Sequence, residues 1–416
     1  MDKRSITRFR FRRALAALLL AAPLSVPAAP TVQDWPLAAP AGAAQPSLDL
    51  APDGRLLLAW LERREGGGHR MRFAGHDVVQ GWSPARTVAE GEDWFVNWAD
   101  VPSLVALPDG SLWAHLLVKN GQGGYAYDTR LLSSRDGGVN WNALGPVHDD
   151  GTRTEHGFAS LWPQARARLG VAWLDGRHTG GGQTRHGHDH HGGGAMSLRT
   201  AVFAADGRKQ QEIELDTRTC DCCQTDVAMT ARGPLLVYRD RSEGEVRDIV
   251  ATRFDGQAWS TPRPVHVDGW VMPACPVNGP AVAAQGEQAW VAWYTAAEGR
   301  PALRLAASTD AGDRFGPPLE VTAGEALLGR VDLAADASGV WLAWMQEDAG
   351  GQSLWLARFA HDLGREHWRL KVADVPGRGR GTGVPRLRLR GGEAWLAWTV
   401  VEAGQPSLRG ARVAPP

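Results

Sequence analysis

Hydrophobic residues recur along the chain in short runs that share one arrangement. Each run is an apolar strand followed by a polar turn, as in LLLAWLERREGG from Leu56 and AWLAWTVVEAGQ from Ala394. Five further copies begin at Leu112, Leu169, Pro234, Ala289 and Val340. Neighbouring copies lie roughly 50 to 65 residues apart, which is the spacing of propeller blades. The pattern therefore predicts seven copies of one structural unit.

Each copy is flanked by further short strands. A strand and turn such as SLDLAPDG precede it, an alternating strand such as MRFAGHD follows it, and an outer strand such as WSPARTVAE comes next. Four antiparallel strands without helical periodicity are typical of a propeller blade. The last copy ends at Val413 after three strands, and TVQDWPLAAP from Thr31 resembles the missing outer strand. We expect an all-β β-propeller of four-stranded antiparallel blades, seven in number with six as the alternative, closed by the N-terminal strand.

Two tight turns repeat within this pattern, SRDGGVNW (Ser134 to Trp141) and STDAGDRF (Ser308 to Phe315). Aspartate can accept backbone N–H groups inside such a turn, and glycine adopts its positive φ. The motif Ser-x-Asp-x-Gly-x-x-Trp resembles the Asp-box (BNR) repeat of sialidase-like β-propellers, and the second copy carries Phe for Trp. With the blade pattern, the resemblance covers most of the chain. It implies a propeller of a superfamily that includes glycan-binding and glycan-hydrolysing proteins.

The N-terminal segment has the layout of a secretory signal peptide. A basic start, MDKRSITRFRFRR, precedes the apolar core ALAALLLAA and the small residues of Val26 to Ala28. We expect a signal peptide at 1–28, a propeller domain at 29–416, and a periplasmic or secreted protein. The apolar core is too short for a membrane span, and no later segment has the roughly 18 apolar residues that a spanning helix needs.

Composition narrows the classes of partner. Lys and Arg number 45 against 46 Asp and Glu, for a net charge of −1, so no overall field attracts nucleic acid or an anionic membrane. The chain has 50 Gly and 19 Trp but 4 Tyr, a composition that favours an all-β repeat fold. The oligomeric state is not indicated.

Antiparallel connectivity sorts the connecting loops between two rims. One rim receives all four cysteines and the densest groups of Arg, Asp and Glu, and we expect the ligand site at the channel mouth there. Its loops are Asp93 to Ser103, His148 to Phe158, Leu174 to Gly194, Asp216 to Asp226, Tyr238 to Asp248 and Asp268 to Pro280.

The family resemblance suggests roles for residues of this rim. Sialidase-like enzymes bind the substrate carboxylate with three arginines, and use a Tyr assisted by Glu as nucleophile and an Asp as acid/base. The catalytic candidates are Glu155, Asp100 and Tyr238. The ligand-binding candidates are Asp175, Arg177, Arg239, Asp240, Arg241, Arg330 and Asn278. The alternative for the Arg and Asp residues is a lattice of ion pairs that joins neighbouring blades. No Tyr follows Tyr294, although the family's nucleophile lies late in the chain, so binding without hydrolysis stays open.

The cysteines support a second function class. Cys220, Cys222, Cys223 and Cys275 can form two disulfides in three connectivities, one of which joins Cys275 to the CDCC loop. Thiolates also select soft metals, so copper or zinc are the candidate cofactors. Further metal candidates are His156, His186, His188, His190 and His191. We expect an exported protein that binds an acidic glycan or a small anionic ligand, with hydrolysis open; the alternatives are a periplasmic metal-binding protein and a protein-interaction scaffold.

Overall fold

The computed structural model describes residues 1–2, 29–165, 167–180 and 194–416. Most of the predicted signal peptide, 3–28, therefore lies outside the described residues, as do the metal candidates His186, His188, His190 and His191. Among the described residues no helix has the length and apolarity needed to cross a membrane. Their one helix is the short 3-10 turn η1 (Ala297–Gly299), and the rest of the regular structure is β-sheet.

The strands form five sheets of four or five strands and one sheet of eight. The first sheet contains β2 (Ala44–Leu50), β3 (Leu56–Arg63), β4 (His69–Asp77), β5 (Gly81–Trp82) and β6 (Arg86–Gly91). The eight-stranded sheet contains β7 (Leu104–Ala106), β8 (Leu112–Lys119), β9 (Tyr127–Ser134), β10 (Asn142–Pro146), β11 (Glu155–Ala165), β12 (Arg168–Asp175), β13 (Ser197–Phe203) and β14 (Lys209–Asp216).

The remaining four sheets have four strands each. One contains β15 (Asp226–Thr230), β16 (Gly233–Arg239), β17 (Ile249–Arg253) and β18 (Arg263–Pro264). The next contains β19 (Ala281–Gln285), β20 (Gln288–Thr295), β21 (Ala302–Ser308) and β22 (Leu319–Ala323). Another contains β23 (Leu327–Asp336), β24 (Gly339–Asp348), β25 (Gly351–Phe359) and β26 (Glu366–Pro376). The last contains β27 (Arg386–Arg390), β28 (Glu393–Glu402), β29 (Gln405–Ala414) and β1 (Thr31–Asp34).

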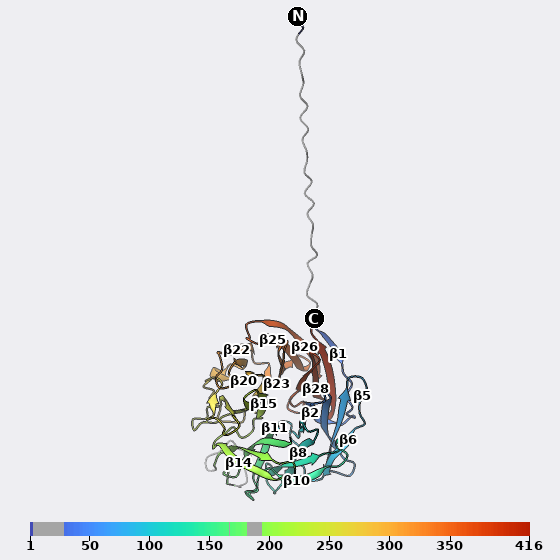
Figure 1. Cartoon of the computed structure of the whole chain (residues 1–416), viewed down its shortest axis with the longest axis vertical. Helices are drawn as coiled ribbons and strands as arrows, with labels where there is room; N and C mark the ends of the chain where they lie inside the picture. Colours follow the sequence, from blue (N-terminus) through green and yellow to red (C-terminus); the bar gives the residue numbers. More distant parts are fainter. Residues whose placement is uncertain (3–28, 166, 181–193) are drawn as a thin grey trace.

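The sheets are arranged around a common centre, as the prediction of a β-propeller requires. In Figure 1 the first strands β2, β11, β15 and β23 lie near the middle of the disc, and β5, β14, β22 and β1 lie at its outer edge. Within each four-stranded unit the pairing is antiparallel, and every apolar run of the sequence becomes a second strand, buried between its neighbours. The prediction of an all-β propeller is confirmed.

The number of blades differs from the prediction. Five of the six sheets are separate blades of four or five strands, so the predicted seven blades, and the alternative six, differ from the five found. The physical reason is a short parallel contact, Tyr127 beside Glu155 and Asp128 beside His156, through which β9 and β11 join two four-stranded units into the eight-stranded sheet. Strand periodicity in the sequence cannot reveal a contact between neighbouring units.

The N-terminal strand takes the predicted place at the outer edge of the last sheet. β1 pairs antiparallel with β29, from Thr31 opposite Ala414 to Asp34 opposite Ala411. Trp35, directly after β1, packs against Trp395 and Trp82 with ring centroids 4.9 and 5.1 Å apart, and so touches both the last sheet and the first. Strand pairing among the described residues does not run continuously around the molecule, so the ring is not closed by hydrogen bonds.

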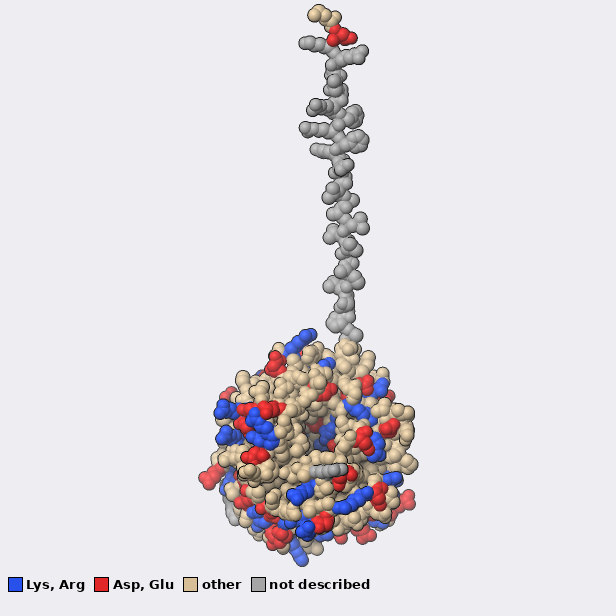
Figure 2. Space-filling model, viewed as in Figure 1, with Lys and Arg blue, Asp and Glu red and all other residues tan. Residues whose placement is uncertain are grey.

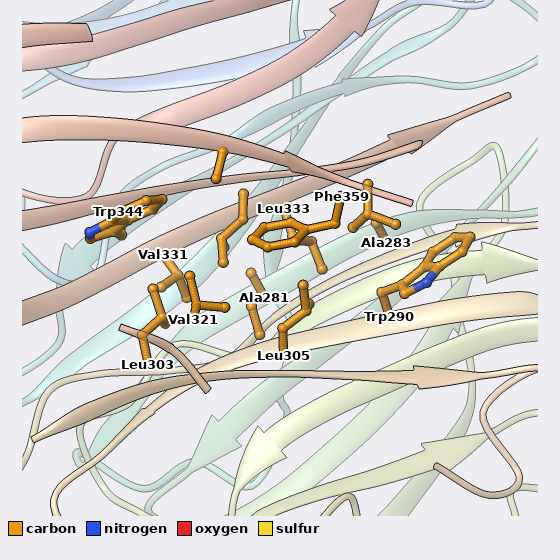
Figure 3. Close-up of a cluster of buried hydrophobic side chains, with 14 of the residues drawn as sticks. Ala281, Ala283, Trp290, Leu303, Leu305, Val321, Val331, Leu333, Trp344 and Phe359 are labelled. Atoms are coloured by element: carbon orange, nitrogen blue, oxygen red, sulfur yellow. The ribbon is translucent and has the colours of Figure 1, made fainter. Parts of the chain in front are cut away.

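Apolar side chains fill the space between neighbouring sheets. Figure 3 shows one such cluster, which we call the apolar seam, between the β19–β22 and β23–β26 sheets. Trp290 and Leu305 come from one sheet, Leu342 and Phe359 from the other, and all four are fully buried. Burial of such side chains stabilises the fold by about 1.5–3 kcal/mol each.

Both Asp-box turns adopt the predicted conformation. Asp136 accepts hydrogen bonds from the backbone N–H of Val139 and Asn140, both at 3.0 Å, in the turn between β9 and β10. Asp310 accepts one from Arg314 N–H at 2.9 Å in the turn between β21 and β22. The motif glycines lie against the preceding sheet: a Cβ on Gly138 would clash with Phe73, and one on Gly312 with Leu235. The turns therefore hold each unit to its neighbour.

Candidate functional site

The predicted rim loops meet through hydrogen bonds. Gln224 donates from its side chain to the carbonyl of Ala99 at 2.8 Å and accepts from Gly279 N–H at 3.0 Å. Thr225 donates its hydroxyl to the carbonyl of Phe158 at 2.9 Å. These contacts join the 93–103, 148–158, 216–226 and 268–280 loops around one surface, as connectivity predicted.

Two of the three predicted catalytic residues share one partner there. The hydroxyl of Tyr127 lies 2.7 Å from an oxygen of Asp100 and 3.0 Å from an oxygen of Glu155. Tyr127 heads β9 and Glu155 heads β11, and the parallel contact of these strands places them side by side. Phe95 stacks on the Tyr127 ring with centroids 3.9 Å apart, which fixes the ring. Asp100 and Tyr127 are buried, and Glu155 is partly exposed.

The backbone at 157–158 makes room for this group. A Cβ on Gly157 would collide with the Tyr127 hydroxyl and the Asp100 carboxylate, so only glycine allows the close approach. Phe158 has a φ of 53°, in the left-handed region, and its N–H donates to Asp100 at 2.9 Å. A strained residue held by its surroundings is a common feature of functional sites.

The pKa of each of the three groups is raised above its ordinary value. Burial raises the pKa of Asp100 to about 6, against the opposing hydrogen bonds from Tyr127 and Phe158. Burial, followed by the charges of Asp100, Asp221 and Cys275, raises the pKa of Glu155 well above its ordinary value. Burial and the two carboxylates raise that of Tyr127. The partly exposed Glu155 is thus a carboxyl group that holds its proton.

A stacked pair of histidines lies next to this group. The rings of His148 and His156 are parallel, with centroids 3.5 Å apart. His148 lies 3.0 Å from both Asp128 and Asp150, and His156 lies 3.1 Å from Asp150. Burial disfavours the charge on both rings, but its hydrogen bond to Asp128 and the nearby carboxylates raise the pKa of His148. The pKa of His156 is lowered, by burial and by His148.

These residues form what we call the polar seam, the buried and half-buried polar groups on either side of the β9–β11 contact. Its members are Asp100, Tyr127, Asp128, His148, Asp150, Glu155, His156 and Asp175.

Most of the predicted ligand-binding arginines are already paired inside the protein. Arg177 makes two hydrogen bonds of 2.8 Å to Asp175 and a further contact of 2.9 Å to Glu212. Arg241 contacts Asp221 at 3.0 Å and Glu245 at 2.8 Å. For these residues and Asp175, the structure has the lattice of ion pairs that the sequence left as the alternative.

Arg239 is a structural residue. It is fully buried and donates to the carbonyls of Asn278 at 2.9 Å, Arg247 at 2.5 Å and Tyr294 at 2.7 Å. Asp240 is half-buried, and its side chain caps the N–H of Arg241 at 2.7 Å. These contacts hold the Arg239 and Asp240 side chains against the protein and do not present them to a ligand.

Arg330 and Asn278 lie nearest the predicted channel site. The Asn278 side chain accepts from Arg330 N–H at 3.0 Å, and Arg330 lines a central cavity. Other side chains lining it are Gln224, Thr225, Asp226, Asp332, Arg386 and Arg388. The guanidinium of Arg330 lies 5.0 Å from the ring centroid of the half-buried Trp98, and that of Arg380 lies 5.7 Å from it. Charges of both signs are mixed over the face in Figure 2.

The tyrosine of the site is one that the sequence did not reveal. The predicted Tyr238 donates its hydroxyl to Asp216 at 2.6 Å, and among the described residues it makes no hydrogen bond to Glu155 or Asp100. Tyr127 takes that place. It lies in an ordinary strand sequence, YDTRLLSS, and only its position opposite Glu155 in the parallel contact distinguishes it.

The four cysteines gather where two rim loops meet. The sulfurs of Cys220, Cys222 and Cys223 all lie within 4.8 Å of one another, and that of Cys222 contacts Cys275 of the 268–280 loop. All four are free cysteines, so the predicted disulfide is not present in this structure. The described residues contain two other groups with metal-ligating atoms, Asp128–His148–His156 and Asp150–His156–Asp175, both within the polar seam.

Comparisons with known proteins agree with this architecture. The family model described as "BNR repeat-like domain" matches residues 54–339. No curated protein matches the chain. Among solved structures, the polysaccharide lyase Uly1 is 9% identical with a TM-score of 0.51, over 89% of this chain and 89% of that one.

Two further structures are similar at lower scores. A protein of unknown function from Dyadobacter fermentans DSM 18053 is 13% identical, with a TM-score of 0.48 over 90% of this chain and 95% of that one. The NanB sialidase of Streptococcus pneumoniae is 10% identical, with a TM-score of 0.45 over 95% of this chain and 71% of that one. At these identities the similarity to Uly1 shows the fold alone, and the two lower scores carry no argument.

Proposed function

This chain belongs to the BNR repeat-like domain family, and on that premise we propose that it binds and cleaves an acidic glycan beside the polar seam. Glu155 is the proton-donating residue of the proposal. The observation that carries it is the partly exposed Glu155 carboxyl, held 3.0 Å from the Tyr127 hydroxyl in surroundings that raise its pKa.

Cleavage of a glycosidic bond requires a proton for the leaving oxygen. A carboxylic acid with a raised pKa keeps that proton near neutral pH and donates it as the bond to the anomeric carbon breaks. In hydrolysis the resulting carboxylate then accepts a proton from the attacking water. Glu155 is the member of its group that is exposed enough to reach a substrate.

Tyr127 and Asp100 act through Glu155 in this proposal. Tyr127 is fully buried, so its hydroxyl orients the carboxyl and does not attack the sugar. Asp100 accepts the hydroxyl proton of Tyr127 at 2.7 Å and thereby fixes the direction in which that hydroxyl points. Both are positioning residues.

The acidic part of the substrate is assigned to the central cavity. Arg330 lines the cavity and already donates to the Thr382 hydroxyl at 2.7 Å and to the carbonyl of Gly379 at 3.0 Å. Arg380, which also lies against Trp98, makes no ion pair with the described residues and is the freer guanidinium. A guanidinium can bind a carboxylate or sulfate through two hydrogen bonds, and an exposed aromatic face can pack against a sugar ring. Trp98 and Asp100 belong to the same loop, which links this surface to the polar seam.

The test is turnover by the purified chain on a panel of acidic substrates. The panel contains acidic polysaccharides, because Uly1 is a polysaccharide lyase, and a fluorogenic sialoside, because the Asp-box motif resembles that of sialidase-like propellers. The bond can be cleaved by hydrolysis or by elimination, and release of reducing ends measures either reaction. Ultraviolet absorbance of an unsaturated product identifies elimination.

Glu155→Gln should lower turnover at least about 100-fold, the usual contribution of a general acid, and leave binding intact. Glu402→Gln, which changes an exposed glutamate on β28, is the matched control and should be fully active. Absence of both binding and turnover across the panel, or equal turnover by Glu155→Gln, would rule the proposal out.

We also propose that residues 1–28 direct export, as their basic start and apolar core suggest. N-terminal sequencing of the protein from fractionated cells tests this. A mature chain that begins near Ala29 in the periplasm or medium is expected, and an intact N-terminus in the cytoplasm would contradict it.

A further inference from the structure

We propose that Cys220, Cys222 and Cys223 form a binding site for a thiophilic metal ion, Cu(I) or Zn(II), with Cys275 as the fourth ligand for zinc. The proposal stands on the cysteine cluster and its surroundings and does not depend on the glycan proposal.

The spacing of the sulfurs suits a single bound ion. The Cys220 and Cys222 sulfurs lie 3.9 Å apart, those of Cys220 and Cys223 lie 2.7 Å apart, and all three are within 4.8 Å of one another. Zinc–sulfur bonds of about 2.3 Å place tetrahedral ligands about 3.8 Å apart. The Cys220 and Cys222 sulfurs already have this spacing, whereas those of Cys220 and Cys223 must separate by about 1 Å, through a change of side-chain rotamer, to bind one ion.

Cys275 approaches the cluster from another loop. Its sulfur contacts that of Cys222, and the residue is exposed, whereas Cys220 and Cys223 are buried. Three thiolates are enough for Cu(I), and the fourth completes the four-thiolate set that is common for structural zinc. The two metals thus differ in their need for Cys275.

Two buried arginines supply a charge that matches a metal–thiolate complex. Arg239 and Arg247 are both buried, and their charges act on sulfurs of the cluster, Arg239 on that of Cys223 and Arg247 on that of Cys220. Three thiolates with Cu(I), or four with Zn(II), carry a net charge of about −2, which two guanidinium groups neutralise. The Nη1 of Arg247 is buried without a hydrogen-bond partner, so this cation is not fully paired by the protein. An uncompensated buried donor is costly unless an anion lies near it.

The loops that carry the sulfurs are held in place by hydrogen bonds. Cys220 N–H donates to the carbonyl of Arg239 at 3.1 Å, and Arg239 donates to the carbonyl of Asn278 at 2.9 Å, near Cys275. Gln224 joins the same two loops through Gly279 at 3.0 Å. Outer contacts of this kind orient metal ligands and tune their affinity.

The first experiment uses the full mature chain, reduced under anaerobic conditions and offered one equivalent of Zn(II) or of acetonitrile-stabilised Cu(I). After gel filtration, elemental analysis should find one ion per chain, and the ion should protect at least three of the four cysteines from alkylation. Reduced protein that retains neither ion, or whose thiols alkylate equally fast with and without it, would overturn the proposal.

Variants then assign the ligands. Cys222→Ser should lose both ions, and Cys275→Ser should lower zinc affinity at least about tenfold while Cu(I) stays bound, as expected when one ligand is lost. Equal zinc affinity in Cys275→Ser would remove Cys275 from the site. Because alkylation protection is measured on the unaltered chain, it remains decisive if Cys222→Ser does not fold.

Two controls separate this site from its rivals. Replacement of His186, His188, His190 and His191 by Ala leaves the cysteines intact, so the ion should be retained; its loss would place the metal on those histidines and overturn the proposal. Mass spectrometry of the unreduced protein from its native compartment tests the second rival, the pairing of the four cysteines in disulfides. Two disulfides and no bound metal would show that the cysteines serve as bridges instead.

Discussion

The apolar seam and the polar seam occupy equivalent positions between neighbouring units but are built from opposite materials. The apolar seam between the β19–β22 and β23–β26 sheets consists of fully buried side chains such as Trp290, Leu342 and Phe359. The polar seam at the β9–β11 contact buries Asp100, His148 and other ionisable groups.

The two seams differ in what they contribute to stability. Burial of apolar area is favourable wherever it occurs. Burial of a charge is unfavourable unless partners compensate for it, and even a paired buried charge often adds little net stability. The polar seam therefore adds little to holding its two units together, which also share a buried apolar cluster that includes Trp113 and Trp173. It is better suited to setting the proton affinity of a partly exposed group such as Glu155.

The largest expected effect concerns the apolar seam. Leu342→Ala, at a fully buried position of β24, should lower the free energy of unfolding by about 2–5 kcal/mol, because it leaves a cavity. Denaturant titration measures this. Turnover and bound metal per folded molecule should stay unchanged. A selective loss of turnover or of metal would contradict the prediction that the apolar seam contributes to stability alone.

The next effect concerns the polar seam. Tyr127→Phe removes the hydroxyl that contacts Asp100 and Glu155, and should cost about 1–3 kcal/mol because buried acceptors lose a donor. The same variant should lower kcat more than it raises KM, since the carboxyl of Glu155 loses its orientation. Steady-state kinetics and denaturant titration together test this; a stability loss with unchanged kcat would reduce Tyr127 to a structural role.

A smaller effect is a pH dependence that belongs to the polar seam. The pKa of Asp100, raised by burial to about 6, lies above the roughly 3.9 of an unfolded aspartate. The folded state therefore binds this proton more tightly, and the stability it contributes is complete below about pH 4 and declines as the pH rises through 6. Asp100→Asn should flatten that part of the profile, and unfolding titrations from pH 4 to 8 measure it. An unaltered slope would exclude Asp100 as its source.

The smallest effect lies in the Asp-box turns, away from both seams. Asp136 accepts two backbone N–H groups and the side chain of Asn140, while Asp310 accepts one backbone N–H. Asp136→Ala should lower the melting temperature by a few degrees and Asp310→Ala by less, with turnover unchanged. Hydrogen bonds hold the pKa of Asp136 below its ordinary value, so its contribution should fade as the pH drops below about 4. Differential scanning calorimetry at pH 7 and pH 3 checks both points.

Local patterns in the sequence predicted the fold well. Alternating apolar strands and the two Asp-box turns are set by residues near one another in the chain, and so the strands, the turns and the place of β1 were predictable. The blade count failed because the parallel contact of Tyr127 with Glu155 depends on how two units meet.

The site was predictable to a smaller extent for the same reason. Glu155 and Asp100 were identified because they fall in loops of one rim, but Tyr127 lies within a strand that looks like any other. The arginines were conspicuous, yet their partners are backbone carbonyls and carboxylates supplied by loop conformation, as with Arg239 and Tyr294. The sequence shows which residues are arginines, but it does not show how many of their hydrogen bonds are already made within the protein.

The pairing of β1 with β29 has a consequence for the order of folding. In Figure 1 the two ends of the propeller lie together at the outer edge, although Thr31 and Ala414 are the extremes of the domain. During synthesis β1 has no partner until β29, the last strand, emerges, and until β1 pairs with it β29 has an unpaired edge that other chains can add to. The entropic cost of joining such distant segments grows only with the logarithm of their separation. The earliest strand to be made is thus the last to be placed, and it protects the nascent molecule from its neighbours.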